Sequence, residues 1–305
     1  MIDFLKRTAI LIFVTLILAS VFSMGSLWKL RNSSFYKPSF LVNDVEEQSF
    51  DYIVLGASTG LTTLNTKYID STMQMTGINL SMDDTGMPSH FLMLQHFLAQ
   101  GKSTKYCILA PGLSSYNSTD EKLSDNDYRF LMFNNSAYVQ DYFKSFKGTE
   151  ARVLTASRYL PLIGVSYYNA ELFYPSLMNI IRPEKRNRFD ERGNYTYPVI
   201  RHTDEGRQDP REINVTFRSQ YLAKIKALCE ENGIRLICYI SPMKDRTAKV
   251  QSLEYEYINH SRKIKGNKFF YDRDHVNTLG RKLASAAFSE ALGNYIEQHL
   301  SPNLN

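Results

Sequence analysis

Cysteine is scarce in this chain. The 305 residues include only three cysteines, Cys107, Cys229 and Cys238. An odd number of cysteines does not form a complete disulfide framework, and their separations do not match the ligand spacing of a zinc site. Cys107 and Cys238 stand within apolar runs, which predicts that both are buried and chemically inert. The cysteines therefore imply neither a metal nor a particular redox compartment.

A large excess of charge of one sign is also missing. The net charge is +5, but residues 1–31 hold four basic residues against one acidic residue, which leaves only +2 for the rest. This balance gives no support for nucleic-acid binding. Disorder is excluded as well, because 43% of the residues are hydrophobic and 22% are charged. The length suits one large globular domain with an accessory segment.

One long uncharged stretch stands at the N-terminus. Residues 8–28 carry no charge and are long enough to cross a bilayer as a helix. A cleaved signal peptide is the alternative, but the length of the stretch favours an uncleaved anchor. Two basic residues flank each side, so only the short tail, residues 1–7, favours a cytoplasmic N-terminus with the main domain exported. We expect residues 29–50 to form a polar, irregular linker and the anchor to contribute nothing to the α/β core.

Short apolar runs alternate with amphipathic segments after the linker. Four runs have the length and composition of buried strands: residues 52–55, 77–80, 105–110 and 234–240. Apolar residues recur at helical spacing in three places: Phe91, Leu94 and Leu98; Phe217, Tyr221, Ile225 and Leu228; and Leu279, Leu283, Leu292 and Ile296. We expect Gly233 to end the second helix and Thr278 to cap the last. This alternation predicts an α/β fold with helices on both faces of a parallel sheet.

The segment from about 114 to 212 interrupts the alternation. Its first part is rich in aromatic residues, and its second part, residues 182–212, is heavily charged with acids and bases nearly in balance. A solvated loop is one interpretation of the charged part, and a lid that contacts substrate is the other. Both interpretations make the segment an insertion at the loop edge of the sheet.

The first predicted strand ends in the sequence LGASTG, which contains G-x-S-x-G around Ser58. Gly56 gives the backbone the freedom for a sharp exit, and the turn would lift Ser58 above the sheet edge. This pattern is typical of a nucleophile elbow, but Gly, Ser and Thr are also common at strand ends for conformational reasons alone. The motif therefore leaves two interpretations of Ser58, a nucleophile or a turn residue.

A second candidate motif, DRDH, lies near the C-terminus. Residues 268–271 are predicted to form a short strand, and Asp272 and His275 follow three residues apart in a loop. A carboxylate in that position can accept the ring N–H of the histidine, so that the other nitrogen faces a serine hydroxyl. Asp274 is the competing carboxylate, although as the immediate neighbour of His275 it would tend to point away. A surface turn before a helix is the alternative interpretation.

Together the two motifs resemble the SGNH, or GDSL-like, superfamily of hydrolases and acyltransferases. In that superfamily the nucleophilic serine follows the first strand, and an Asp-x-x-His motif precedes the last helix. The resemblance implies a catalytic triad of Ser58, His275 and Asp272. It also implies a three-layer α/β/α domain of flavodoxin-like type over residues 51–300, preceded by one transmembrane helix. An α/β-hydrolase also uses G-x-S-x-G, but there the elbow usually follows several strands.

The sequence departs from the SGNH pattern in the blocks that supply the oxyanion hole. Where the second block usually has a glycine, this chain has Ser81, whose backbone N–H could still donate. In the third block Gly112 is retained, but Ser114 replaces the usual asparagine. Loss of one such donor weakens oxyanion stabilisation by a few kcal/mol, on the order of a hundredfold in rate. In this degeneracy and in its N-terminal anchor, the chain is similar to the branch of the superfamily that includes the D-alanyl-lipoteichoic acid transfer and alginate O-acetylation proteins.

The resemblance implies two alternative functions. The first is a membrane-anchored, extracytoplasmic serine esterase or O-acyltransferase that acts on a cell-envelope glycopolymer, with no metal or organic cofactor. A multi-span membrane-bound O-acyltransferase is then the expected partner, because activated acyl donors are made in the cytoplasm. The second is a catalytically silent SGNH-like protein that binds a glycan or scaffolds an envelope assembly. Neither alternative involves nucleic acid.

Overall fold

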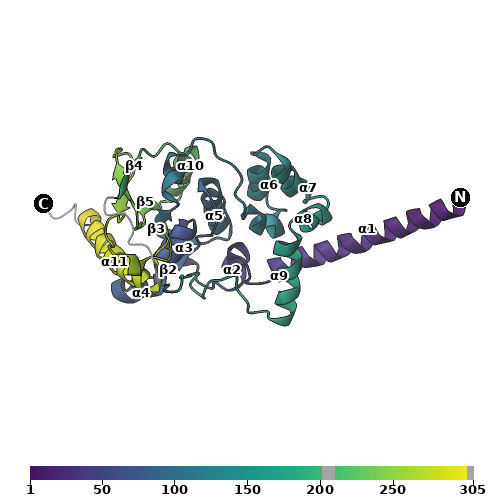
Figure 1. Ribbon diagram of the computed structural model, residues 1–305, viewed down its shortest axis with the longest axis horizontal. Helices are drawn as coiled ribbons and strands as arrows, with labels where there is room; N and C mark the ends of the chain where they lie inside the picture. The colour runs from purple at the N-terminus through teal and green to yellow at the C-terminus, as the bar shows by residue number, and fades with distance from the viewer. Residues whose placement is uncertain (201–209, 301–305) are drawn as a thin grey trace. The chain divides into compact units, whose positions relative to one another are not determined.

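The computed structural model describes residues 1–200 and 210–300 (Figure 1). The chain forms two compact units: a helical unit of Met1–Glu46 with Asp127–Asn187, and a sheet unit of Glu47–Asn126 with Arg188–Asn305. The expected boundaries of one domain over 51–300 with an insertion at 114–212 therefore need correction. The insertion is divided between the units, because its aromatic part packs with the N-terminal segment.

The sheet unit is built on a five-stranded sheet in which all neighbouring strands are parallel. In spatial order the strands are β2 (Gly77–Asn79), β1 (Ser49–Gly56), β3 (Ser103–Ala110), β5 (Arg235–Ile240) and β7 (Tyr257–Asn259). The longest pairing joins β1 to β3, from Ser49 opposite Ser103 to Gly56 opposite Ala110. The sequence predicts four of these strands and the parallel α/β arrangement, which is confirmed. It does not predict β7, which has only three residues.

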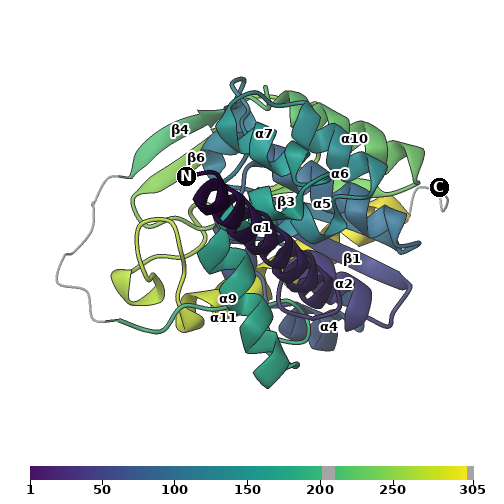
Figure 2. The ribbon, with the colours of Figure 1, turned by 90° about the vertical axis from the view of Figure 1, so that its right-hand side faces the viewer.

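Helices lie on both faces of this sheet (Figure 2). They are α4 (Thr66–Met73) and α11 (Thr278–Leu300) on one face, and α5 (Met87–Ala99) and α10 (Gln220–Glu231) on the other. On the first face, Tyr52 and Val54 of β1 share a buried cluster with Phe288 of α11. On the second face, the thiol of Cys107 in β3 lies beside Cys229 of α10. All three cysteines are buried and free, and burial raises the pKa of the Cys238 thiol.

The buried face of α11 differs from the predicted one. Leu279 and Leu283 are 46% and 45% exposed, whereas Ala284, Phe288 and Leu292 are buried. The physical reason is the helical repeat, because the nine positions between Leu283 and Leu292 turn the helix by about 180° beyond whole turns. A shared apolar character along the sequence does not place these residues on one face.

The ends of α10 match the sequence only in part. Gly233 has a φ of 67° and follows the last turn, as predicted. Phe217, however, lies before the helix, and Ser219 caps the N-terminus by accepting a hydrogen bond from the Leu222 N–H at 3.1 Å. The remaining elements of the sheet unit are α3 (Ser58–Thr63), η1 (Leu113–Asn117), η3 (Asn267–Phe269) and the parallel pair β4 (Arg211–Val215) and β6 (Arg246–Val250).

The helical unit contains the long apolar helix α1 (Ile2–Arg31), which is long and apolar enough to cross a membrane. Its other elements are α2 (Lys37–Asn43), η2 (Asp127–Phe133), α6 (Ala137–Lys144), α7 (Thr149–Ala156), α8 (Pro161–Tyr167) and α9 (Asn169–Ile181). Most of α1 is exposed, but Ser23, Ser26 and Leu30 in its last turns are buried. The last turns of α1 pack against α8 and α9. These turns therefore belong to the core of the helical unit, a unit that the sequence does not predict.

The predicted irregular linker over 29–50 is mostly regular structure. Helix α1 continues to Arg31, α2 follows, and β1 begins at Ser49. The first five residues of α2 are buried, with Phe40 and Leu41 fully inaccessible. This segment joins the core of the helical unit because its apolar residues, rather than its polar ones, decide where it packs.

Candidate active site

Ser58 stands at the carboxyl end of β1, as the first residue of α3. The two glycines of the motif have a steric role here. A Cβ on Gly56 would lie 2.1 Å from the Ala110 carbonyl oxygen, and one on Gly60 would lie 2.8 Å from it. The end of β3 therefore approaches the turn so closely that only glycine fits at either position. This close approach holds the Ser58 turn against the sheet edge.

His275 and Asp272 meet Ser58 in a continuous hydrogen-bonded chain. The Nε2 atom of His275 lies 2.8 Å from the Ser58 Oγ, and its Nδ1 lies 2.9 Å from both carboxylate oxygens of Asp272. The structure thus brings together three residues that are up to 217 positions apart. The His275 side chain is only 17% exposed, whereas that of Asp272 is 47% exposed.

The loop that carries these residues is shaped by Asp272 itself. Its Oδ1 accepts hydrogen bonds from the backbone N–H groups of Asp274 at 2.8 Å and His275 at 2.9 Å. These bonds close the turn and fix the carboxylate under the imidazole. Asp274 points to another partner, because it forms an ion pair with Arg246. The carboxylate that contacts His275 is therefore Asp272, as the spacing predicts.

Two local predictions around this loop are wrong. Residues 268–271 are not a strand but include the 3₁₀ turn η3, with Phe270 forming a single antiparallel bridge to Val276. The cap of α11 is Asn277 rather than Thr278, because the Asn277 Oδ1 accepts from the N–H groups of Leu279 and Gly280. The Asn277 amide also donates to two carbonyls of the loop, so one buried side chain fixes both the loop and the helix start.

A pocket with a volume of about 190 Å³ opens beside Ser58 and His275. Its walls come from the carboxyl ends of three adjacent strands: Ser58 and Thr59 after β1, Pro111 to Ser114 after β3, and Ile240, Ser241 and Met243 at the end of β5. Tyr116, Arg246 and Asp274 also line it. Ligands of open α/β sheets typically bind at this edge, next to the strand where the order reverses.

The structure separates the three residues predicted for the oxyanion hole. Gly112 and Ser114 line the pocket, and within the described residues no hydrogen bond occupies the Gly112 N–H. Ser81 does not line the pocket, and its N–H donates to the Asn79 Oδ1 at 3.0 Å. Contrary to the prediction, Ser81 is therefore not positioned to donate to an oxyanion.

Ser241 is a pocket residue that sequence reasoning missed. Its side chain is 5% exposed, and its hydroxyl makes no hydrogen bond within the described part of the chain. A buried hydroxyl without a partner is costly, so a bound group that supplies one is favoured there. The only sequence signal was its position directly after the apolar run that forms β5, at the same sheet edge as Ser58.

Tyr197, from the charged part of the insertion, forms an aromatic wall next to the triad. Its ring stacks on Tyr271 with centroids 4.2 Å apart and meets the His275 ring edge-on at 5.3 Å. The Tyr197 carbonyl accepts hydrogen bonds from the N–H and the hydroxyl of Thr278, both at 3.0 Å. The sequence left two interpretations of the charged part, a solvated loop and a lid. The stretch around Tyr197 contacts the site. Residues 201–209 of the same part lie outside the described residues.

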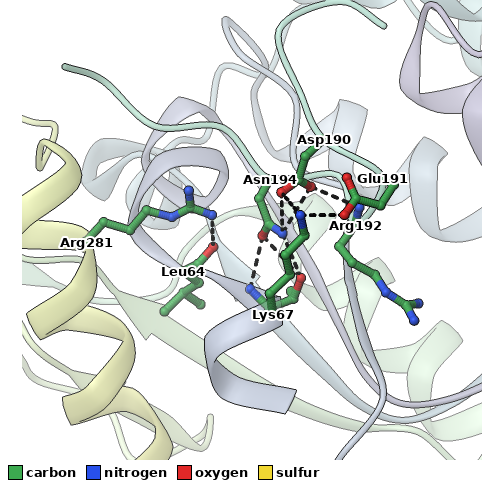
Figure 3. Close-up of polar contacts among 8 residues, drawn as sticks. Leu64, Lys67, Asp190, Glu191, Arg192, Asn194 and Arg281 are labelled. Atoms are coloured by element: carbon green, nitrogen blue, oxygen red, sulfur yellow. Dashed lines mark hydrogen bonds and ion pairs between the residues drawn. The ribbon is translucent and has the colours of Figure 1, made fainter. Parts of the chain in front are cut away.

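A polar cluster ahead of Tyr197 holds this stretch on the sheet unit (Figure 3). Asn194 accepts a hydrogen bond from the Thr66 N–H at 3.0 Å and so caps α4 from a distance in sequence. Asp190 accepts from the Asn194 N–H and pairs with Lys67 at 3.0 Å. Arg281 of α11, buried nearby, donates to the Leu64 carbonyl, and burial lowers its pKa to about 10. Tyr197 is thus presented to His275 from an anchored segment.

The arrangement supports nucleophilic chemistry on a serine hydroxyl. A hydroxyl bonded to an imidazole, which is bonded in turn to a carboxylate, is the geometry that activates serine in acyl transfer. Among the described residues, no group of three or more His, Cys, Asp or Glu side chains is arranged to hold a metal ion. Neither protein-family models nor curated proteins match this sequence.

Proposed function

We propose that this chain is a membrane-anchored serine esterase or O-acyltransferase of the SGNH type. The observation that carries the proposal is the hydrogen-bonded chain from Ser58 through His275 to Asp272 at the mouth of a pocket. The sheet order supports the fold assignment, because its strands taken in chain order run 2-1-3-4-5, as in three-layer flavodoxin-like domains.

In the proposed reaction the Ser58 Oγ attacks the carbonyl carbon of an ester, and its proton passes to the His275 Nε2. The tetrahedral intermediate collapses when His275 returns that proton to the departing alcohol oxygen, which leaves an acyl group on Ser58. Water or an acceptor hydroxyl then attacks the acyl-enzyme and gives its proton to His275, which passes it to the Ser58 Oγ as the acyl–serine bond breaks and the acid or the new ester leaves. Asp272 orients the imidazole and stabilises its charged form throughout.

The oxyanion is assigned to donors from three strand ends. The Ser58 N–H is at the start of α3, where a helix leaves its first N–H groups without partners inside the helix. The Gly112 N–H and the Ser114 hydroxyl come from the end of β3. The Ser241 hydroxyl, which has no partner within the described residues, replaces in part the donor that the SGNH pattern takes from asparagine.

The size of the pocket favours a short acyl group. Its volume of about 190 Å³ is below the 300–1,000 Å³ of sites that enclose drug-sized ligands. An acetyl group or another short acyl chain fits this space, and the alcohol part of the ester would extend out of the pocket. This geometry is compatible with a glycopolymer whose hydroxyl groups carry small esters.

The location and the partner complete the proposal. Helix α1 would cross the membrane once and hold the sheet unit on the extracytoplasmic side, where envelope glycopolymers lie. In transfer, a multi-span membrane-bound O-acyltransferase would supply the acyl group from the cytoplasm. Full glycopolymer acylation in cells that lack every such acyltransferase would contradict the partner and leave a stand-alone esterase.

A catalytically silent glycan-binding protein is the second candidate. It is favoured by the hydrogen bond that engages the Ser81 N–H, because this bond removes one expected oxyanion donor. Covalent labelling of the full chain with a fluorophosphonate tests the two candidates directly. We expect labelling in the native chain, none in Ser58→Ala, and full labelling in Ser71→Ala, which removes an exposed hydroxyl on α4. Absence of both labelling and aryl acetate hydrolysis would leave the binding protein as the better candidate.

A further inference from the structure

Helix α9 of the helical unit exposes an apolar face. Five of its apolar residues are between 39% and 73% exposed: Phe173, Tyr174, Leu177, Ile180 and Ile181. They recur at the spacing of a single helical stripe. The preceding segment adds the exposed Tyr159, Leu160, Ile163 and Tyr167. So many exposed large apolar side chains on two neighbouring helical segments are unusual for a protein in water and typical of a region that contacts membrane or protein.

This face is continuous with the membrane helix. An apolar groove of about 540 Å³ lies between α1 and α9, lined on the α1 side by Val21, Phe22, Gly25, Ser26, Trp28 and Lys29. Phe173, Ser176, Leu177 and Ile180 line it on the α9 side. The two helices also touch through a hydrogen bond from the Ser176 Oγ to the Ser26 Oγ, 3.0 Å long. Small hydroxyl residues in such contacts are characteristic of helices that pack within membranes.

The groove fixes the depth of α9 relative to the apolar stretch of α1. That stretch ends at Trp28, and Val21 lies seven residues before it, which corresponds to about 10 Å along the helix. Because α9 contacts α1 over this part, its apolar face lies level with the last 10 Å or so of the apolar layer. A helix in the membrane interface is buried to about 5–10 Å, so the depths agree.

The direction and flanks of α9 also fit an interface. In Figure 1 α9 runs across α1 rather than along it, so a helix α1 that crosses the bilayer leaves α9 closer to the membrane plane than to its normal. Trp28 and Tyr174 are aromatic residues of the kind enriched at headgroup level. Lys29 follows the apolar stretch of α1, and the exposed Arg182 ends α9, where each can meet lipid phosphates.

We infer that α9 is a second membrane contact, which lies in the interface beside α1 with its apolar face and the groove filled by lipid acyl chains. This inference rests on the part of the proposed function in which α1 spans the membrane, and it is independent of the ester chemistry. Lipid is the occupant that the continuity with α1 favours. A second copy of the chain or another protein on the same face gives a different result in the experiment below.

The test uses the full chain in vesicles of phosphatidylcholine and phosphatidylglycerol, with nitroxide labels on single introduced cysteines. Leu177→Cys and Ile180→Cys report on α9, Val14→Cys on the middle of α1, and Ala227→Cys on the exposed surface of α10. The native cysteines are buried, so the unsubstituted chain controls for background labelling. Collisions with oxygen and with a nickel chelate, present on both sides of the membrane, measure exposure to lipid and to water.

We expect the labels at 177 and 180 to resemble the one at 14, with frequent oxygen collisions and at least tenfold fewer nickel collisions than at 227. Trp28, the single tryptophan, should be quenched most by lipids brominated near the headgroup end of their chains. Nickel access at 177 and 180 equal to that at 227, with 14 still protected, would overturn the α9 contact alone. Protection from both reagents would show a protein cover and also overturn it.

The same vesicles separate this inference from the proposed chemistry. Nickel access at position 14 would show that α1 does not span the bilayer, and the α9 contact would fail with it. Hydrolysis of an aryl acetate reports on Ser58 independently of where the labels lie, and the helicity measured by circular dichroism shows that the helical unit of each labelled variant is folded. A Ser58→Ala chain with the same label pattern would confirm that the membrane contact does not depend on catalysis.

Discussion

At the residue scale, the candidate triad is held by backbone groups more than by its own three side chains. Asp272 accepts two backbone N–H groups besides the imidazole, and glycine at positions 56 and 60 lets β3 approach the Ser58 turn. Each triad member therefore sits in a geometry fixed before any substrate binds. Such preorganisation is what makes a serine hydroxyl reactive in a site of this kind.

The triad predicts a specific order among substitutions. Ser58→Ala and His275→Ala should each lower the turnover of an aryl acetate by about 10⁴-fold or more, because the members act as a unit. Asp272→Asn should leave a small measurable activity, since the amide oxygen can still accept the backbone N–H groups. Steady-state kinetics with thermal unfolding as the folding control measure this. Native turnover in Ser58→Ala would refute the nucleophile.

Two buried histidines predict how stability changes with pH. Burial lowers the pKa of His260 to about 4 and that of His90 to about 3, from 6.5 in the unfolded chain. As pH falls below 6.5 the unfolded state binds protons first, so stability is complete above 6.5 and is lost toward pH 4. For His260 this loss reaches up to about 3 kcal/mol.

The measurement compares urea unfolding at pH 7.5 and 4.5 in three chains. His260→Gln should show a smaller loss of unfolding free energy between the two pH values than the native chain. Ser71→Ala, at an exposed site on α4 that carries no titratable group, should follow the native chain. Acidic groups that titrate in the same range, such as Asp70, are present in all three and cancel in the comparison. An unchanged slope in His260→Gln would contradict the assignment.

At the element scale, the sequence predicts the strands and the loop whose pattern lies in one continuous stretch. It does not predict the contacts that form only in the folded chain. The sequence shows the apolar runs of β1, β3 and β5 and the D-x-x-H loop, because each of them is a continuous stretch of residues. The hydrogen bond of the Ser81 N–H cannot be recognised in the sequence, although its partner Asn79 is only two residues away, because the bond forms only in the folded turn. The buried face of α11 differs from the prediction for another reason, since the phase of the helix rather than the number of apolar residues selects that face.

The cap that Asn194 provides to α4 predicts a coupling between a distant loop and the triad. Asn194→Ala removes the acceptor for the Thr66 N–H, which should cost about 1–2 kcal/mol of unfolding free energy. It should also lower kcat/KM for an aryl acetate about tenfold, because Tyr197 then no longer supports His275. Asn232→Ala at the end of α10 is the control, and there activity should not change. Equal activity in both variants would show that Tyr197 is only a neighbour.

At the scale of the whole molecule, two segments far apart in sequence form one unit, and no local sequence pattern predicts this association. Residues 1–46 and 127–187 associate through side chains such as Tyr36, whose hydroxyl donates to the Glu171 carbonyl. Composition marked residues 8–28 as an apolar helix, and the structure agrees in that respect. Composition alone could not show that the last turns of that helix also belong to a protein core, because the burial of Ser26 depends on its contact with Ser176.

This shared packing predicts that two truncations of the N-terminus differ sharply. Removal of residues 1–19 leaves Ser23, Ser26 and Leu30 in place, so the helical unit should keep a cooperative thermal transition in detergent. Removal of residues 1–28 also deletes Ser26 and the α1 wall of the groove, so α8 and α9 lose their neighbour. We expect this chain to lose helicity and to be cut by protease between 144 and 182, while the sheet unit and its fluorophosphonate labelling persist. Equal protease resistance in both truncated chains would show that the last turns of α1 do not stabilise the helical unit.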